Sequence, residues 1–582
     1  MSSTLPFTES KFDIVDELLR QQQSLSAVEQ FSALHDADDS VIAPAQEQYY
    51  RRLLPATPPS ADQQFAFEVD LDQCSGCKAC VVACHTLNGL DEDESWRRVG
   101  TITIGEVLPA QTPLEKLSSN GSLTNESSPS LSLPTVGHVT TACHHCEDPG
   151  CLNGCPVRAY EKDPLTGIVR HLDDQCIGCK YCMMMCPYEV PQYSERLGIV
   201  RKCDMCHQRL SVGEAPACVQ ACPNEAIAIK LVDRGAVFDD GQRLAPDAPL
   251  SEITKPSTRY KSVRREAVAA AVPQDRGVDE VAESHWPLAV MLVATQISVG
   301  IILVERTLSL GWVMAGAGTS ERLTQVSALV ALLIGGIGLN VAPLHLGRPL
   351  RAWRIFLGLR TSWLSREAVI LGKYMGLLGA ATVLLWMPAF ADYVPESIST
   401  WIPDWAGKAA LGLSIVTGIV GLYCSAMIYI ATNRELWRSG RTLGRFFATG
   451  LVAGLTLVAA MASFLGSGTS GAVLGLAAVG VVIVKIIWEW QIHLGAIERC
   501  NDKDRRSADL IKGHMKPLRN GRIISAAVGG FVVLLASVIS PVSPLIAGSM
   551  LLIGAASLMS GEMLERLLYF KSVVYDRMPG TF

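Results

Sequence analysis

Cysteine spacing constrains this 582-residue chain more than any other feature. Sixteen of the 18 cysteines lie between residues 74 and 222, in four groups of four. The groups are Cys74, Cys77, Cys80 and Cys84; Cys143, Cys146, Cys151 and Cys155; Cys176, Cys179, Cys182 and Cys186; and Cys203, Cys206, Cys218 and Cys222. The first and third follow C-x2-C-x2-C-x3-C, and a proline directly follows the last cysteine of the second, third and fourth groups. This spacing is typical of cysteines that hold [4Fe–4S] clusters.

Disulfides and zinc fit the pattern less well. Dense disulfides belong to small secreted domains, and the first 25 residues show no apolar stretch of a signal peptide. Structural zinc usually needs two ligand pairs set far enough apart to close a tetrahedron, whereas here four thiolates fall within eleven residues. We therefore expect four [4Fe–4S] clusters in a domain that is made and kept in the cytosol.

The grouping also predicts how the ligands are shared. In paired-cluster ferredoxins the fourth cysteine of each run ligates the other cluster. We therefore expect an inner unit from the second and third groups, nested in an outer unit from the first and fourth. The expected ligand sets are Cys143, Cys146, Cys151 with Cys186; Cys176, Cys179, Cys182 with Cys155; Cys74, Cys77, Cys80 with Cys222; and Cys203, Cys206, Cys218 with Cys84. Residues 159–174 predict a strand–turn–strand hairpin inside the inner unit.

Histidines lie close to these cysteines in the sequence. They are His85, His144, His145, His171 and His207. Because cysteines already complete all four sets, we interpret the histidines as hydrogen-bonding groups and not as ligands. The two remaining cysteines, Cys424 and Cys500, lie in the second half of the chain.

The second half predicts a membrane domain. Eight apolar segments lie near 286–304, 323–344, 367–388, 408–431, 446–465, 471–492, 523–540 and 544–564. Most are long enough to cross a bilayer as helices. The fold class we expect is an α+β, ferredoxin-like, double-ferredoxin iron–sulfur domain followed by an all-α bundle of eight transmembrane helices.

This reading divides the chain into four parts. Residues 1–65 are expected to be a helical extension, with apolar residues at helical spacing over 9–34. Residues 66–232 form the cluster domain, with a flexible Ser/Pro-rich insert at 108–137. Residues 233–284 are read as a charged linker, and 285–582 as the membrane anchor.

Charge in the loops predicts the orientation. The loops after the second, fourth and sixth spans carry seventeen Lys and Arg, whereas Arg306 and Arg322 are the basic residues noted in the opposite loops. Basic loops stay in the cytoplasm. We therefore expect a multi-pass protein of the inner (cytoplasmic) membrane, with the cluster domain on the cytoplasmic face. The net charge of −6, without a basic patch, argues against nucleic-acid binding.

The cysteine-rich part resembles the four-cluster iron–sulfur subunit of the dimethyl sulfoxide reductase family. The resemblance is carried by FEVDLDQCSGCKACVVACHTLNG, by CHHCEDPGCLNGCPVRAYEKDPLTGIVRHLDDQCIGCKYCMMMCPYEVPQY and by RKCDMCHQRLSVGEAPACVQACPNEAI. The second half is similar to that family's eight-span anchor, through PLHLGRPLRAWR (343–354), SWLSREA (362–368) and GEMLERLLYF (561–570). The resemblance implies a non-catalytic subunit that carries electrons from membrane quinol to a separate molybdopterin catalytic subunit.

The resemblance also implies a quinol site. A histidine after span two and a carboxylate opening span three are implicated in such anchors, and they match His345 and Glu367. The chemistry agrees, because oxidation of menaquinol or ubiquinol releases protons to groups that titrate near neutrality. The alternative is that both residues only hydrogen-bond lipid headgroups or each other.

For the other charged residues in the spans we predict structural roles. Lys485 and Glu489 are four apart and can pair on one helix face. Glu562, Glu565 and Arg566 are read as anchors for the end of the last span. No haem is expected, because His345 and His493 would hold it half in water.

We expect electrons to enter at the cluster of Cys84, Cys203, Cys206 and Cys218, nearest the membrane, and to leave from that of Cys74, Cys77, Cys80 and Cys222. Three alternatives remain: a polysulfide-, nitrite- or nitrate-reducing complex, a dehydrogenase that runs electrons into quinone, and a ferredoxin-like regulator. The residues do not select the terminal substrate, the quinone, the direction of flow, the cluster potentials or the oligomeric state.

Overall fold

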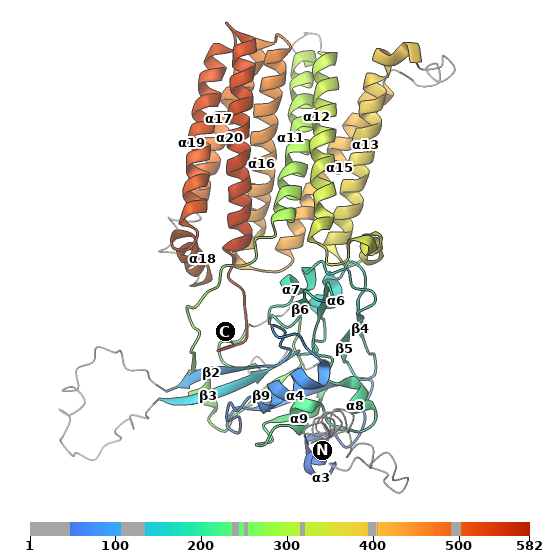
Figure 1. The fold of residues 1–582 in the computed structure, drawn as a ribbon, viewed down its shortest axis with the longest axis vertical. Coiled ribbons are helices and arrows are strands. Elements are labelled where there is room, and N and C mark those ends of the chain that lie inside the picture. The colour runs from blue at the N-terminus through green and yellow to red at the C-terminus, as the bar shows by residue number, and fades with distance from the viewer. Residues whose placement is uncertain are drawn as a thin grey trace, which may run out of the picture.

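A cluster domain of short strands and helices stands against one end of a bundle of long helices (Figure 1). The structure is a computed structural model that describes residues 47–105, 134–235, 244–249, 254–314, 320–393, 403, 405–490 and 502–581. The predicted helix at 9–34, most of the predicted insert at 108–137, and His493 lie outside the described residues.

The outer part of the cluster domain is closed by two strands that lie far apart in sequence. Strand β1 (Gln63–Asp70) pairs antiparallel with β8 (Ile227–Asp233), from Gln63 opposite Asp233 to Val69 opposite Ile227. β1 precedes the first cysteine group and β8 follows the fourth. Their pairing therefore encloses the inner unit, and helices α4 (Ala79–Asn88) and α9 (Ala217–Gln220) of the outer unit pack together.

The inner part contains two small hairpins and two short helices. They are β4 (Tyr160–Lys162) with β5 (Val169–His171), β6 (Gln192–Ser194) with β7 (Ile199–Arg201), and helices α6 (Gly150–Gly154) and α7 (Tyr181–Met185). The β4–β5 pair confirms the predicted hairpin. Its turn is held by Asp163 Oδ1, which accepts the N–H of Leu165 at 2.8 Å.

The two units repeat one backbone bend. In Cys-x-Gly-Cys-Lys of the first and third groups, Gly76 and Gly178 have φ of +72° and +70°. Lys78 and Lys180, the residues that cap α4 and α7, have φ of +62° and +58°. Glycine takes this left-handed conformation without steric cost because it has no Cβ. The cysteine loops of both units are therefore built alike.

The cluster domain extends beyond its predicted boundaries. β3 (Thr135–Thr141) pairs with β2 (Arg98–Ile104), so residues 135–137 are strand and not insert. The predicted linker contributes β9 (Arg259–Lys261), parallel to β1, and β10 (Val272–Pro273), antiparallel to β2. Upstream of 66, Tyr50 is buried in the domain core. These segments satisfy backbone groups that sheet edges would otherwise leave unpaired.

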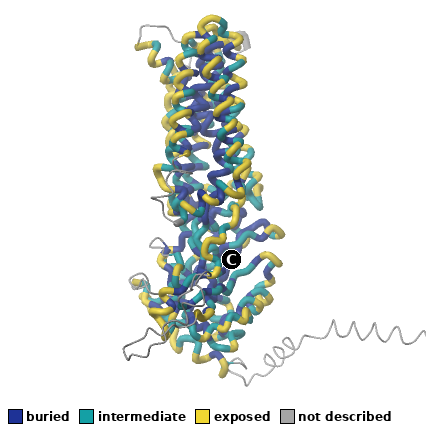
Figure 2. The backbone as a smooth tube through the Cα atoms, turned by 90° about the vertical axis from the view of Figure 1, so that its left-hand side faces the viewer, coloured by how far each residue is buried: buried dark blue, intermediate teal, exposed yellow. Residues whose placement is uncertain are grey.

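The bundle contains the eight predicted spans. Within the described residues, eight helices are long and apolar enough to cross a membrane. They are α11 (Trp286–Met314), α12 (Glu321–Val341), α13 (Trp363–Trp386), α15 (Ala406–Ile430), α16 (Ser439–Phe464), α17 (Gly468–Trp490), α19 (Lys516–Ile539) and α20 (Pro544–Lys571). α11 and α16 are the most buried, and exposed residues gather on the outer surface of the bundle (Figure 2).

A close backbone contact joins α11 to α16. A Cβ on Gly300 of α11 would lie 1.9 Å from the carbonyl oxygen of Gly450, and one on Gly454 would lie 2.3 Å from that of Gly300. Small residues let membrane helices approach in this way. The contact links the helices α11, α12, α13 and α15 to the helices α16, α17, α19 and α20.

The strongly basic loops lie at the end of the bundle that meets the cluster domain. After α12 the chain forms two 3₁₀ segments, η2 (Ala342–His345) and η3 (Pro349–Gly358). Arg351 and Arg354 donate to the carbonyl of Asp174 at 2.7 and 2.9 Å, and Arg348 donates to that of Asp173 at 3.2 Å. The basic loops and the cluster domain therefore share one side of the bundle. At the opposite end, Lys408 joins Arg306 and Arg322 as a further basic residue.

Candidate metal centres and the membrane junction

Two cavities in the inner unit are lined by cysteines. One holds about 360 Å³ of atom-free space and the other about 270 Å³, in each case partly open to solvent. The cysteines of the first, called the inner set, are Cys143, Cys146, Cys151 and Cys186. Those of the second, called the junction set, are Cys155, Cys176, Cys179 and Cys182. Each set takes its fourth cysteine from the neighbouring group, as the predicted crosswise sharing requires.

The outer cysteines also gather in two sets. The distal set is Cys74, Cys77, Cys80 and Cys222, and within it Cys74 interacts electrostatically with the other three. The central set is Cys84, Cys203, Cys206 and Cys218, whose sulfurs interact in the same way. The structure therefore brings together the residues of all four predicted sets.

The donor chemistry of these sets fits iron–sulfur clusters. Burial raises the pKa of Cys84 to about 12 and that of Cys206 to about 11, so a thiolate here needs a bound cation to stabilise it. In the parts of the chain that the structure describes, no three His, Cys, Asp or Glu side chains converge on a point that could hold a single metal ion. The sulfurs surround a space instead, as four ligands of a cubic cluster do.

Backbone N–H groups point at the cysteine sulfurs. The amide of Ala159 lies 3.2 Å from Cys155 Sγ, and that of Gly178 lies 3.4 Å from Cys176 Sγ. The amide of Met205 lies 3.4 Å from Cys203 Sγ. Hydrogen bonds to the sulfurs are one of the means by which a protein sets a cluster potential.

The four sets form a row. Cys203 of the central set interacts electrostatically with Cys143 of the inner set, and Cys218 interacts with Cys80 of the distal set. Tyr160 lies beside cysteines of both the inner and the junction sets. The order is therefore junction, inner, central, distal. At the far end of the row, Cys77 is exposed.

The junction set is the set that packs against the bundle. The expectation that the set of Cys84, Cys203, Cys206 and Cys218 would lie nearest the membrane is therefore wrong. Tyr181, next to the junction cysteines, donates to the carbonyl of Ile428 in α15 at 3.0 Å. Ser362, which caps α13, donates to that of Gly154 at 2.7 Å. α6 and α7 lie against the bundle, while α4 and α9 lie on the far side of the domain (Figure 1). Cysteine spacing orders the row but does not say which end packs on the helices.

Three glycines allow the close approach at this junction. A Cβ on Gly178 would lie 2.4 Å from the carbonyl oxygen of Gly198, and one on Gly347 would lie 2.2 Å from it. The N–H of Arg348 donates to the carbonyl of Ile177 at 3.1 Å. The loop after α12 thus lies directly against the loop that carries Cys176 and Cys179.

His345 and Glu367 both lie at this junction. His345, in η2, contacts the backbone of Cys179, and its Nε2 is buried without a hydrogen-bond partner. Glu367 lies in α13, is 3% exposed, has an unpartnered Oε1 and lies close to Tyr181. No hydrogen bond or ion pair joins the two side chains. The structure therefore places both predicted site residues beside the junction set, as separate groups.

Sequence reasoning missed His285, Arg97 and Lys202. His285 precedes α11, is 6% exposed and packs against His345 with ring centroids 5.1 Å apart. An ionisable residue at the start of a span could have identified it. Arg97 and Lys202 are buried cations that interact with cysteines of neighbouring sets. Their position depends on the packing of distant strands, so no local pattern marks them.

The histidines next to the cysteines are hydrogen-bonded, with one exception. His85, His171 and His207 contact the Asp91 carbonyl, Asp173 and Asp204 at 3.1, 2.7 and 2.8 Å, and His145 Nδ1 accepts from Val169 at 3.0 Å. His144 packs edge-on against Tyr188, and neither ring nitrogen has a hydrogen-bond partner.

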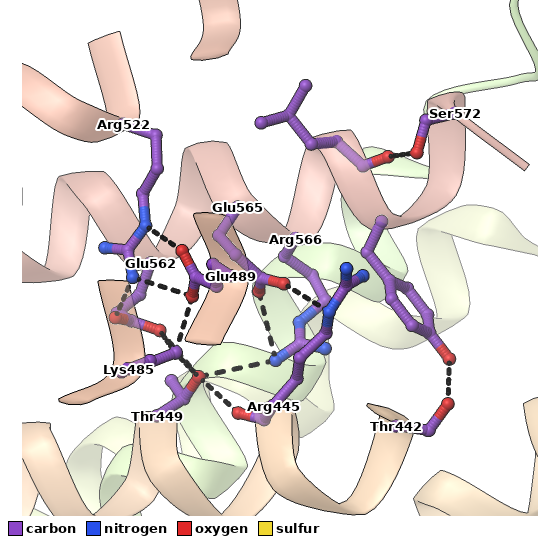
Figure 3. Close-up of polar contacts among 12 residues, drawn as sticks. Thr442, Arg445, Thr449, Lys485, Glu489, Arg522, Glu562, Glu565, Arg566 and Ser572 are labelled. Carbon is purple, nitrogen blue, oxygen red and sulfur yellow. Dashed lines mark hydrogen bonds and ion pairs between the residues drawn. The ribbon is translucent and has the colours of Figure 1, made fainter. Parts of the chain in front are cut away.

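A network of buried charges lies inside the second half of the bundle (Figure 3). Its members are Arg445, Lys485, Glu489, Arg522, Glu562, Glu565 and Arg566, each at most 5% exposed. Arg522 bridges Glu489 and Glu562 at 3.0 Å each, and Lys485 lies 3.7 Å from Glu489 as their spacing predicts. The reading of Glu562 and Glu565 as helix-end anchors is wrong, because both lie in the interior of α20, which ends at Lys571.

The fold and the cysteine cavities define an iron–sulfur electron-transfer protein with its own multi-pass membrane anchor. Residues 135–232 match the family model of the 4Fe-4S dicluster domain, and residues 281–571 match that of the DMSO reductase anchor subunit (DmsC). This protein belongs to the dimethyl sulfoxide reductase family, as a fusion of its iron–sulfur subunit with its DmsC-type anchor.

Curated relatives match the iron–sulfur part. The B subunit of anaerobic dimethyl sulfoxide reductase of Haemophilus influenzae is 31% identical over 201 residues, 34% of this chain and 89% of that protein. The B subunit of the Escherichia coli K12 enzyme is 34% identical over 199 residues, 34% of this chain and 88% of that protein. The iron–sulfur subunit of nitrate-inducible formate dehydrogenase of Escherichia coli K12 is 37% identical over 179 residues, 29% of this chain and 57% of that protein.

Proposed function

We propose that this chain takes electrons from menaquinol or ubiquinol in the membrane and delivers them, through four [4Fe–4S] clusters, to a separate molybdopterin catalytic subunit. The observation that carries the proposal is the row of four cysteine sets, which runs from His345 and Glu367 at the bundle to the exposed Cys77. The relatives named as subunits of anaerobic dimethyl sulfoxide reductase support a molybdoenzyme partner and a role in anaerobic respiration.

Each set is proposed to hold one cluster through its four cysteines. A [4Fe–4S] cluster supplies reversible one-electron transfer when bound. The protein contributes the thiolates, the amides that point at them, and the buried cations between neighbouring sets. The distal set, of which Cys77 is exposed, is the proposed point of transfer to the catalytic subunit, because electrons must leave where a partner can approach.

His345 and Glu367 are proposed to bind and deprotonate the quinol. Each presents a buried polar atom without a partner, His345 through Nε2 and Glu367 through Oε1, and buried polar atoms normally find one. Hydroxyl groups of a quinol can donate to both atoms. Because His345 contacts the backbone of Cys179, a quinol held here lies next to the junction set.

We propose that the membrane is the inner one and that the cluster domain faces the cytoplasm. The shared side of the basic loops and the cluster domain supports this, since basic loops are retained in the cytoplasm. The catalytic partner would then also work in the cytoplasm.

The first test compares His345→Ala and Glu367→Gln with the unchanged chain, each purified anaerobically. Both variants should lose quinol-dependent reduction of the clusters and keep reduction by dithionite, because only the quinol step needs a proton acceptor. His514→Ala, an exposed histidine on the same side of the bundle, is the matched control. Normal quinol kinetics in both variants would remove this site, and fewer than about sixteen irons per chain would contradict four clusters of four irons.

A second candidate function is electron flow in the opposite direction, from a dehydrogenase into quinone. The similarity to a formate dehydrogenase iron–sulfur subunit favours it. Midpoint potentials decide between the two. A junction-set cluster with a potential above that of the quinone couple supports quinol oxidation, and one well below it supports quinone reduction.

A further inference from the structure

A large cavity lies where the cluster domain meets the bundle. It holds about 980 Å³ of atom-free space, part of it open to solvent, and it is lined by residues of the cluster domain, of the segment before α11 and of the segment after α20. Its lining includes the charged residues Lys180, Glu280 and Glu283, together with His285. The ring of His285 lines this cavity and also packs against His345, and only 6% of the residue is exposed. His285 therefore lies between the cavity and His345.

A series of ionisable groups leads from the proposed quinol site to this cavity. The rings of His345 and His285 pack edge to face, with centroids 5.1 Å apart. On the other side, His285 Nδ1 lies 3.8 Å from Glu283 Oε2. Neither His345 Nε2 nor His285 Nδ1 has a hydrogen-bond partner. The separation of His285 Nδ1 and Glu283 Oε2 exceeds a hydrogen bond by less than about 1 Å, so a small shift of either side chain closes it.

Burial favours the neutral form of His285 at pH 7. It lowers the pKa of His285 below its usual value; the charge of Glu283 opposes this effect, and the smaller effect of Lys180 adds to it. Helix α20 contributes only the apolar ring of Phe570 to this contact, and η2 contributes His345. A neutral imidazole can accept a proton from one side and release it on the other.

Glu283 stays ionised at the mouth of this route. Burial raises the pKa of Glu283, but hydrogen bonds from Lys180 at 2.8 and 2.9 Å outweigh it and hold the pKa below its usual value. Its carboxylate is half-exposed to the cavity. An ionised carboxylate beside His285 that is half-exposed to water can receive a proton from the imidazole and release it to the solvent.

We propose that His285 and Glu283 carry the protons of the quinol from the membrane site to the aqueous cavity. The proposal rests on the proposed quinol site. Oxidation of one quinol breaks two O–H bonds and leaves a quinone; two electrons leave one at a time towards the junction set, and two protons leave through His285 and Glu283 to water. Protons and electrons therefore emerge on the same side of the membrane, and quinol oxidation moves no net charge across it.

The test measures the rate at which a reduced short-chain naphthoquinone reduces the clusters of the full-length protein, in H₂O and in D₂O. His285→Ala and Glu283→Gln should each slow the reaction by about tenfold or more, with a larger solvent isotope effect and unchanged quinol affinity. Added imidazole should restore the rate of His285→Ala, because the cavity gives it access to the vacated position. Glu280→Gln, at an exposed carboxylate lining the same cavity, should match the unchanged protein.

Two further comparisons make the outcome decisive. Lys180→Met removes the ion pair of Glu283 but keeps its carboxylate, so a fast Lys180→Met beside a slow Glu283→Gln assigns the effect to the proton acceptor. Dithionite reduction of every variant checks that the clusters are assembled. Unchanged rates and isotope effects in His285→Ala and Glu283→Gln, with His345→Ala inactive, would overturn this proposal alone. A loss that imidazole does not restore and that lowers quinol affinity would also overturn it.

Discussion

Two buried cations lie between neighbouring cysteine sets. Arg97, 2% exposed, interacts with cysteines of the central and distal sets, and Lys202, 2% exposed, interacts with those of the inner and central sets. Arg97 is held by a hydrogen bond to Thr140 at 3.1 Å and lies 4.8 Å above the ring of Phe67. A buried positive charge stabilises the more negative, reduced state of a nearby cluster.

Replacing Arg97 should therefore lower cluster potentials. We expect Arg97→Gln to shift the midpoint potential of the central or distal cluster downwards by about 60 mV, a tenfold change in a one-electron couple. Arg97→Lys keeps the charge and should shift it much less. Redox titration followed by electron paramagnetic resonance measures both. Equal potentials in Arg97→Gln and the unchanged protein would show that this charge is screened from the clusters.

At the scale of elements, the α11–α16 contact joins the two halves of the bundle. A side chain at Gly300 has no room, because its Cβ would lie 1.9 Å from a backbone oxygen of α16. On the same helix, a Cβ on Gly311 would meet no atom within 4 Å. The two positions therefore separate helix packing from the general effect of replacing glycine in α11.

Gly300→Val should destabilise the bundle by about 3 kcal/mol or more, since the two backbones must separate. Gly311→Val should change stability by no more than about 0.5 kcal/mol. Thermal unfolding in detergent, followed by the near-ultraviolet circular dichroism of the bundle tryptophans, measures both variants. Equal unfolding temperatures for the two variants would contradict the close contact.

At the scale of the whole molecule, the segment after α20, residues 572–581, connects the bundle to the cluster domain by packing against that domain. After α20 the chain runs back into the cluster domain, where Met578 is 1% exposed in the core. The N–H of Thr101 in β2 donates to the carbonyl of Gly580 at 3.1 Å, and the N–H of Gly580 donates to Asp275 at 2.9 Å. The last residues of the chain therefore stabilise its first domain.

Deleting residues 576–582 should leave the eight helices inserted and make the cluster domain more sensitive to protease. Met578→Asp should act in the same direction, because it places a charge in the core of that domain, whereas Met578→Leu keeps the packing and should resemble the unchanged protein. Limited proteolysis of membranes, read together with iron content, measures the effect. Equal cleavage of Met578→Asp and Met578→Leu would show that the segment contributes no stability.

Local patterns determined a large part of this protein. The cysteine spacing predicted how the sixteen sulfurs divide into four sets. Three cysteines of each set come from one group, and the fourth comes from the paired group, as in paired-cluster ferredoxins. Hydropathy predicted eight spans, since each must be apolar along its own length. The hairpin at 159–174 followed from its Asp-Pro and Gly turn residues.

The tertiary structure decided how those parts meet. Only packing between distant segments shows that the junction set faces the bundle, that residues 259–273 complete the sheets of the cluster domain, and that His285 lies between His345 and a cavity. The charged residues of α20 were predicted to anchor the helix end, because the sequence gives the position of a residue along its own helix but not the residues that it contacts on other helices. Three of the four cysteines of each set, and all residues of one span, lie within one short stretch of sequence, whereas the junction depends on contacts between surfaces that no local pattern encodes.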